Sequence, residues 1–159
     1  EEIISDKDRN APMLKEAEIF QLFSPGSFEE IELKVIGDER GSLIALEQGQ
    51  NIPFNIKRAY YIFGTQPDVS RGYHAHRQLE QMVVCVAGSC RIFMDDGVVS
   101  DSVVLSSSNK ALLIKNMIWR EMHDFSSDCV LLVFASEHFN EADYIRSYDE
   151  FMVEVKNGK

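Results

Sequence analysis

Short segments of alternating apolar and polar residues, each closed by turn residues, occupy most of this 159-residue chain. Side chains in a strand alternate between two faces, so each such segment predicts a strand with one buried face. The pattern predicts strands over residues 31–36, 42–47, 56–63, 71–76, 80–87, 89–95, 98–105, 112–115, 118–125 and 129–135. About ten short strands with a turn every eight to twelve residues are typical of an all-β barrel or sandwich.

The two ends of the chain depart from this pattern. Residues 141–155 space their apolar side chains as a helix does and predict a short C-terminal helix. Residues 1–15 are polar and weakly patterned, so we expect a flexible tail or linker there, and one domain over 16–159. The chain opens on Glu1, which suits a processed product or a domain cut from a longer polypeptide.

Acidic residues outnumber basic ones, and the formal net charge is −10 with a pI near 4.8. Proteins that bind nucleic acids or anionic membranes present a basic patch, so we expect neither partner. A few local arginines still suffice to bind a phosphorylated small molecule. The longest apolar run, residues 129–135, is too short to cross a bilayer, and no signal peptide is visible. These observations favour a cytoplasmic protein.

The cysteine content predicts no disulfide framework. Cys85, Cys90 and Cys129 are odd in number, and all three lie in segments that resemble strands. We therefore expect three buried, reduced thiols. A Cys85–Cys90 disulfide across a hairpin is the alternative.

Two histidines on one predicted strand are the strongest candidates for chemistry. His74 and His76 lie within Arg71-Gly-Tyr-His-Ala-His76 and are two residues apart, so both rings should project from the same face of the strand. If that face lines a barrel, two titratable rings share one pocket. Histidine moves protons near neutral pH and is also a common metal ligand, so both roles are considered.

The metal hypothesis rests on the layout of metal-binding cupins, in which a His-x-His pair is joined by a nearby carboxylate and a late histidine. Here Glu80 and Glu121 could join the two histidines as ligands. The usual late motif, Pro-x-Gly-x-x-His, is missing: Asn116 replaces the proline, Ile118 the glycine and Glu121 the histidine. We therefore expect no bound metal.

The acid–base hypothesis requires only that the imidazole rings are buried. A barrel interior desolvates an imidazole and tunes its proton affinity, so one ring could take a proton from a carbon beside a carbonyl. The other ring, or a nearby tyrosine, could orient the base or stabilise the enolate oxygen. Arg71 and Arg120 flank the pocket segments and are candidates to bind phosphate or sugar oxygens. Among Tyr61, Tyr73 and Trp119 we expect some core residues and some platforms for a base or sugar ring.

Several longer strings resemble one known family. They are Gly41-Ser-Leu-Ile-Ala-Leu-Glu47, Asn51-Ile-Pro-Phe-Asn-Ile-Lys-Arg-Ala-Tyr-Tyr-Ile-Phe63, Arg71-Gly-Tyr-His-Ala-His76, Gly88-Ser-Cys-Arg91, Trp119-Arg-Glu-Met-His-Asp-Phe-Ser126 and Ala142-Asp-Tyr-Ile-Arg-Ser-Tyr-Asp149. In this order, over roughly residues 31–152, they resemble the nucleotide-sugar 3,4-ketoisomerases, which are cupins acting on dTDP-4-keto-6-deoxyglucose.

The resemblance implies a jelly-roll barrel, a homodimer that exchanges N-terminal strands, and catalysis without a metal or other cofactor. It implies a dTDP-linked 4-keto-6-deoxy sugar as substrate and a 3-keto-6-deoxyhexose as product. An aminotransferase would then convert this product to a 3-amino-3,6-dideoxy sugar for glycans such as O-antigen lipopolysaccharide or an S-layer. Some relatives are fused to an N-acetyltransferase domain, so this chain could be an excised C-terminal domain, although tag removal explains its first residue equally well.

The resemblance also implies a site. His74 and His76 fall on the family's catalytic histidines. We expect His74 to shuttle the proton from C3 to C4 through an enediol, with His76 as partner acid or orienting group, and the reverse order stays open. The implied substrate-binding residues are Arg71, Arg120, Arg40, Tyr61, Tyr73, Trp119 and His123. A 3,5-epimerase of the same sugars and a non-catalytic sugar-binding cupin are the alternatives, and the configuration of the product at C4 is left open.

Overall fold

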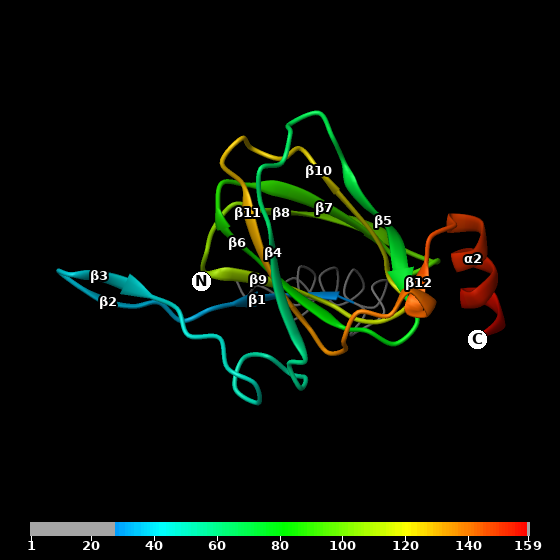
Figure 1. Ribbon diagram of the computed structural model, residues 1–159, viewed down its shortest axis with the longest axis horizontal. Coiled ribbons are helices and arrows are strands. Elements are labelled where there is room, and N and C mark those ends of the chain that lie inside the picture. Colours follow the sequence, from blue (N-terminus) through cyan, green and yellow to red (C-terminus); the bar gives the residue numbers. More distant parts are fainter. Residues whose placement is uncertain (1–27, 159) are drawn as a thin grey trace, which may run out of the picture.

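The computed structural model describes residues 28–158, a β-barrel with a projecting hairpin and a C-terminal helix (Figure 1). The strands are β1 (Phe28–Glu32), β2 (Ile36–Asp38), β3 (Gly41–Leu43), β4 (Arg58–Ile62), β5 (Arg71–His76), β6 (Gln81–Ala87), β7 (Cys90–Asp95), β8 (Ser100–Leu105), β9 (Lys110–Ile114), β10 (Trp119–His123), β11 (Val130–Ala135) and β12 (Tyr144–Ile145). The helices are the 3₁₀ helix η1 (Glu141–Asp143) and the α-helix α2 (Tyr148–Asn157).

Two five-stranded antiparallel sheets form the barrel. One sheet has the order β1-β9-β6-β11-β4 and the other the order β12-β5-β10-β7-β8, so neighbouring strands come from distant parts of the chain. This crossing arrangement is typical of jelly rolls. Buried apolar side chains fill the space between the sheets, among them Ile92, Leu112, Leu131 and Val133. The prediction of an all-β cupin barrel with a short C-terminal helical segment is confirmed.

One predicted strand, 42–47, ends early. β3 stops at Leu43 because the following chain lies across the outer face of the first sheet instead of pairing with it. There Ile52 and Phe54 pack against Met82. The side-chain amide of Asn51 closes this covering loop through hydrogen bonds to backbone groups of residues 45 and 47, each 2.8 Å long. Burial of the sheet's second face therefore overrides the local alternation.

The β2–β3 hairpin projects away from the barrel (Figure 1). The predicted strand 31–36 is split so that its last residue, Ile36, starts this hairpin. About half of the surface of three aliphatic residues is exposed here: 49% for Val35, 50% for Ile36 and 58% for Leu43. Full burial of an aliphatic side chain contributes about 1.5–3 kcal/mol, and these half-exposed side chains forgo part of it, so the hairpin has the composition of a segment that packs against another surface.

The predicted C-terminal helix, 141–155, is only partly correct. Tyr144 and Ile145 were expected on the apolar face of that helix, but they form β12 and pair antiparallel with His76 and Ala75 of β5. The α-helix starts later, where Ser147 caps it by accepting a hydrogen bond from the backbone N–H of Glu150. The β-sheet edge at β5 thus captures two residues whose spacing also suits a helix.

Helix α2 packs on the outer face of the second sheet. Its Phe151 is fully buried against Ala75, Trp119 and Ile145. The three cysteines are buried free thiols, as expected, and the alternative Cys85–Cys90 disulfide is wrong. Within residues 28–158, the helices are too short and too polar to pass through a bilayer.

Candidate active site

The strand β5 carries both histidines on its inward face. His74 and His76 lie two residues apart, and their ring centroids are 4.9 Å from each other in an edge-to-face arrangement. The expectation that both rings share one face of a strand and point into the barrel is therefore met. His76 is fully buried, whereas His74 lies in the wall of a pocket.

A glycine allows β5 to approach β10 closely at this point. Gly72 has a φ of +94°, a backbone conformation that side chains disfavour, and a Cβ there would lie 2.8 Å from the carbonyl oxygen of Arg120. The register between β5 and β10 shifts beside it, between Arg120 and Glu121. This bulge places the Arg120 side chain next to the histidines, because bulges re-aim the side chains that flank them.

Asp143 fixes the orientation of His76. Nδ1 of His76 lies 3.1 Å from Oδ2 of Asp143, so the carboxylate accepts a hydrogen bond from the Nδ1–H group. The lone pair of the ring is then on Nε2. Asp143 is itself held by the backbone N–H groups of Gln78, at 2.8 Å, and Leu79, at 3.3 Å. The Nε2 atom of His76 is buried without a hydrogen-bond partner among the described residues.

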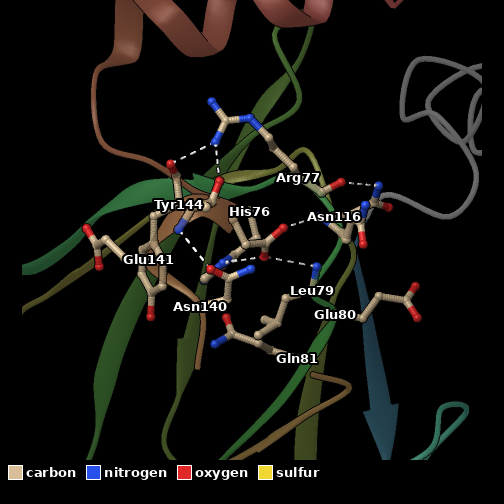
Figure 2. A network of polar contacts seen from close by, with 12 residues as sticks. His76, Arg77, Leu79, Glu80, Gln81, Asn116, Asn140, Glu141 and Tyr144 are labelled. Atoms are coloured by element: carbon tan, nitrogen blue, oxygen red, sulfur yellow. Dashed lines mark hydrogen bonds and ion pairs between the residues drawn. The ribbon is translucent and has the colours of Figure 1, made fainter. Parts of the chain in front are cut away.

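Arg77 ties the loop that carries Asp143 to the C-terminal helix. Its Nη1 donates to the backbone carbonyl oxygens of Ala142 (2.8 Å) and Tyr144 (3.0 Å), as Figure 2 shows. The same guanidinium binds the carboxylates of Glu150 and Glu154 on α2, at 2.8 and 2.6 Å. Helix α2 therefore stabilises the segment from which Asp143 and Tyr144 reach the histidines.

Arg120 places a positive charge with few hydrogen-bond partners inside the barrel. The residue is fully buried, and its Nε and Nη1 atoms have no hydrogen-bond partner among residues 28–158. Its Nη2 makes one long contact, 3.4 Å, with the carbonyl oxygen of Lys115. Burial lowers the pKa of Arg120 to about 10, so the group still carries its charge at neutral pH. A buried cation of this kind is a ready binding group for an anion or a polarised carbonyl.

A pocket of about 530 Å³ opens beside His74. It is lined by Tyr60, Tyr61, Ile62, Phe63, Arg71, Gly72, His74, Met122, Tyr144 and Arg146. Its wall therefore combines one imidazole, two arginines and three tyrosines. Pockets of a few hundred Å³ with few convergent polar groups are typical of small-molecule sites.

Both histidines are neutral in this environment. Burial in the barrel, followed by the charge of Arg120, lowers the pKa of His74 to about 4. The same two causes lower the pKa of His76 to about 2. Two neutral imidazoles can accept protons but have none to donate as imidazolium at pH 7. Of the two roles expected for His76, the geometry and the charge favour orientation over acid catalysis.

These lowered pKa values predict how stability depends on pH. Between about pH 6.5 and pH 4 the unfolded chain binds protons at His74 and His76, whereas the folded chain does not. The free energy of unfolding therefore falls as the pH is lowered through this window, by up to about 1.4 kcal/mol per pH unit for each ring. Urea titrations from about pH 7.5 to pH 4.5 measure the slope.

The matched control is the His74→Gln variant, which should lose about half of this pH dependence. The exposed histidine His138 supplies a second control, since His138→Gln should leave the slope unchanged. A free energy of unfolding that is flat between about pH 6.5 and pH 4.5 contradicts neutral, buried histidines.

Three expected substrate-binding residues lie outside the pocket. Side chains on β10 alternate, and Arg120 points inward, so Trp119, Glu121 and His123 point outward. There Nε1 of Trp119 donates to Glu121, and Nε2 of His123 lies 2.8 Å from the same carboxylate. Tyr73 packs edge-on against His123 on this outer face. In this chain Trp119, His123 and Tyr73 are therefore not gathered with His74 around the pocket.

Arg40 also lies away from the pocket of its own chain. It sits in the β2–β3 hairpin, pairs with Asp38, and has 84% of its side-chain surface exposed. Arg71, Arg120 and Tyr61, by contrast, do gather around His74, either in the pocket wall or buried behind it. Glu121, a ligand in the metal hypothesis, is on the outer face of β10 and cannot reach the two histidines.

Sequence reasoning missed the residues around His76. Asp143 and Tyr144 stand in the string 142–149, but a helix was expected there, which would have separated them from β5. Tyr60 is not singled out by the sequence, whereas the structure places it in the pocket wall. The signal that was available is Ser147 inside this string, a residue that can cap a helix and so places the helix start after Tyr144.

Comparisons with known proteins agree on one group. Residues 27–156 match the family described as FdtA, "WxcM-like, C-terminal". The TDP-4-oxo-6-deoxy-alpha-D-glucose-3,4-oxoisomerase of Aneurinibacillus thermoaerophilus is 53% identical over 121 residues, which are 76% of this chain and 87% of the relative.

Two solved structures give the same result. A 3,4-ketoisomerase from Helicobacter canadensis is 47% identical with a TM-score of 0.79, and the match covers 81% of this chain and 97% of that one. A histidine-to-asparagine mutant of the 3,4-ketoisomerase QdtA from Thermoanaerobacterium thermosaccharolyticum was solved in complex with TDP-4-keto-6-deoxyglucose. It is 40% identical with a TM-score of 0.80, and the match covers 83% of this chain and 96% of that one.

Proposed function

Because this chain belongs to the FdtA family of WxcM-like C-terminal domains, we propose that it is an isomerase, a sugar 3,4-ketoisomerase that converts TDP-4-keto-6-deoxyglucose to its 3-keto isomer. The observation that carries the proposal is a neutral imidazole, His74, in the wall of a pocket of about 530 Å³ with a buried cation behind it. Such a site can remove a proton beside a ketone and stabilise the resulting charge.

The chemistry follows from these positions. The C3–H bond of the substrate is adjacent to the C4 ketone, so its removal by His74 gives an enediol. The same imidazole, now protonated, returns the proton to C4, and the carbonyl forms at C3. Asp143 holds the His76 ring in place through a hydrogen bond, and the His74 ring packs edge-on against it. Arg120 stabilises the oxyanion that develops during proton removal, because its Nε and Nη1 have no hydrogen-bond partner among residues 28–158 and are free to donate to it.

The nucleotide part would lie toward the open end of the pocket. Arg71 lines this pocket from the first residue of β5 and suits the pyrophosphate, since guanidinium binds phosphate oxygens in pairs. Tyr61, 65% exposed and 5.7 Å from the ring of Phe63, offers an aromatic surface to the thymine base. Tyr61 and Phe63 point to the same side of β4, as residues two apart on a strand do.

A proton NMR time course tests the proposal. Protein treated with a chelator should convert TDP-4-keto-6-deoxyglucose to a 3-keto isomer, with loss of the C3 proton signal in D₂O. Deuterium at C5 with the ketone kept at C4 would indicate the 3,5-epimerase instead. Tight binding without any exchange at C3 would indicate a non-catalytic binding protein. A conversion that stops after chelation and returns with a metal would contradict the metal-free chemistry.

The protein also suits a homodimer in which N-terminal segments exchange between subunits. The β2–β3 hairpin leaves the barrel with Val35, Ile36 and Leu43 exposed, which is the composition of an interface segment. Arg40 on this hairpin then reaches substrate only in the pocket of the partner. Residues 1–27, which include the expected tail over 1–15, lie outside the described residues.

A heterodimer experiment tests this arrangement. The two variants are Arg40→Ala and His74→Asn, each expected to be inactive as a homodimer. In a heterodimer of the two, one pocket would combine an intact His74 with an intact Arg40 from the other subunit. We therefore expect about half of the wild-type kcat from heterodimers isolated through two affinity tags. An inactive heterodimer would mean that Arg40 serves its own barrel, and an active Arg40→Ala homodimer would remove Arg40 from the site.

The cellular role follows from the product. A 3-keto-6-deoxyhexose linked to TDP is a substrate for a transaminase, so we place the reaction in the synthesis of 3-amino-3,6-dideoxy sugars for O-antigen, lipopolysaccharide or S-layer glycans. Nucleotide sugars of this kind are made in the cytoplasm, which is the location we propose. We propose one domain over residues 16–159, and the family match over residues 27–156 supports it.

A further inference from the structure

The proposed isomerisation needs a group that handles the oxygen protons. While a hydrogen moves from C3 to C4, a proton must reach O4 and another must leave O3. Neither His74 nor His76 carries a spare proton at neutral pH, since Arg120 and burial keep both rings neutral. Arg120 can stabilise charge but does not release a proton under these conditions. An additional acid in contact with the histidines is therefore required.

Tyr144 stands where such an acid is needed. Its ring centroid lies 4.9 Å from that of His74 and 4.2 Å from that of His76, and the residue lines the pocket. Its hydroxyl makes no hydrogen bond to any of residues 28–158, which leaves it free for a ligand. The other inner tyrosine, Tyr60, instead accepts a 2.9 Å hydrogen bond from the buried amide of Gln81.

The backbone of Tyr144 is held in place by strand pairing and by a side-chain hydrogen bond. It pairs with His76 in the β5–β12 ladder, and its carbonyl oxygen accepts a hydrogen bond from Arg77. Figure 2 shows Tyr144 beside His76, with Arg77 donating to its backbone carbonyl oxygen. A side chain anchored in this way keeps its distance to the histidines, which is what proton transfer requires.

Two cations lie close to Tyr144. The guanidinium carbon of Arg146 lies 4.3 Å from the centroid of the Tyr144 ring, a cation–π contact. The buried charge of Arg120 also interacts with Tyr144. Arg146 is kept in place by Glu141, to which its Nε donates over 2.6 Å. A phenolate formed during the reaction would therefore meet positive charge on both sides.

We infer that Tyr144 is a third catalytic residue, which carries a proton from O3 to O4 of the sugar. The inference rests on the proposed ketoisomerase function. As His74 takes the proton from C3, the phenol of Tyr144 gives its proton to O4 and becomes a phenolate. The enediol then collapses: the phenolate takes the proton from the O3 hydroxyl, the C3 carbonyl forms, and the imidazolium of His74 protonates C4. Tyr144 and His74 both return to their starting state, so atoms and charges balance.

The Tyr144→Phe variant tests the inference, because it removes only a hydroxyl that has no partner among the described residues. We expect kcat to fall about 10²-fold, with KM within about threefold and the melting temperature unchanged. The matched control is Tyr148→Phe, since Tyr148 lies on α2 and its hydroxyl bonds to Asp95 on the outer face. That variant should keep the wild-type kcat.

A second measurement does not depend on the phenylalanine variant. Incorporation of 3,5-difluorotyrosine at position 144 makes the phenol more acidic, so the basic limb of the kcat profile should move to lower pH. A Tyr144→Phe variant with wild-type kcat, or a basic limb that fluorination leaves in place, overturns the inference. If the wild-type protein itself fails to isomerise the substrate, the proposed function is wrong, and the two failures are thereby distinguished.

Discussion

The His74→Asn variant is expected to lose about 10²- to 10⁴-fold in kcat for ketose isomerisation, the range that a positioned general base contributes. The asparagine amide cannot accept a proton, so exchange at C3 in D₂O should stop together with product formation. Binding of the TDP-sugar should change little, because Arg71 and Tyr61 lie at the open end of the pocket and remain intact. NMR measures the rate and titration calorimetry the binding.

His123→Asn is the matched control for this experiment. His123 is also a histidine on the second sheet, but it lies on the outer face of β10 against Glu121. Its variant should keep the wild-type kcat within about twofold. Loss of activity in His123→Asn together with retained activity in His74→Asn would place the site on the outer face and contradict the account.

The Arg120→Met variant is expected to separate activity from stability. Its kcat should fall about 10²- to 10³-fold, because a charge that stabilises the developing oxyanion is lost. The ligand-free protein, however, should gain about 1–4 kcal/mol of unfolding free energy. A buried cation with Nε and Nη1 unpaired is costly, and a methionine of similar length can occupy the same buried space without a charge. Urea unfolding gives the second quantity.

A surface arginine on the neighbouring strand serves as the comparison. Arg91 on β7 is paired with Asp124 over 2.7 Å and is partly exposed. Arg91→Met should leave kcat near the wild-type value. It should change the free energy of unfolding by no more than about 0.5 kcal/mol. A marked loss of stability in Arg120→Met would show that the guanidinium has structural partners, and the charge at the site would need another explanation.

The sequence predicts this fold well where one rule acts alone. The alternation in 71–76 places His74 and His76 on one inward face, and the structure agrees. The same rule also separates Arg120 from Trp119 and His123 on β10. The resemblance treated all three as substrate-binding residues because it carries no information about faces. The alternation alone predicts that Trp119 and His123 lie on the face opposite to Arg120, as the structure has them.

Competing signals explain the remaining errors. Tyr144 and Ile145 suit both a helix and a strand, and only the free edge of β5 decides between them. That edge is formed by residues almost seventy positions earlier, so local spacing cannot reveal it. The position of Arg40 depends on where a hairpin packs outside its own barrel. Asp143 could not be predicted from local sequence, because its contact with His76 joins two segments that are distant in the chain.

A crystal structure of the protein with bound TDP-4-keto-6-deoxyglucose tests the central claim most directly. The quantity to measure is the distance from Nε2 of His74 to C3 and C4 of the sugar. We predict about 3–3.5 Å to both carbons, with the C4 oxygen directed toward Arg120 and Tyr144. A sugar ring bound beyond reach of His74, or a metal ion held between His74 and His76, would contradict the account.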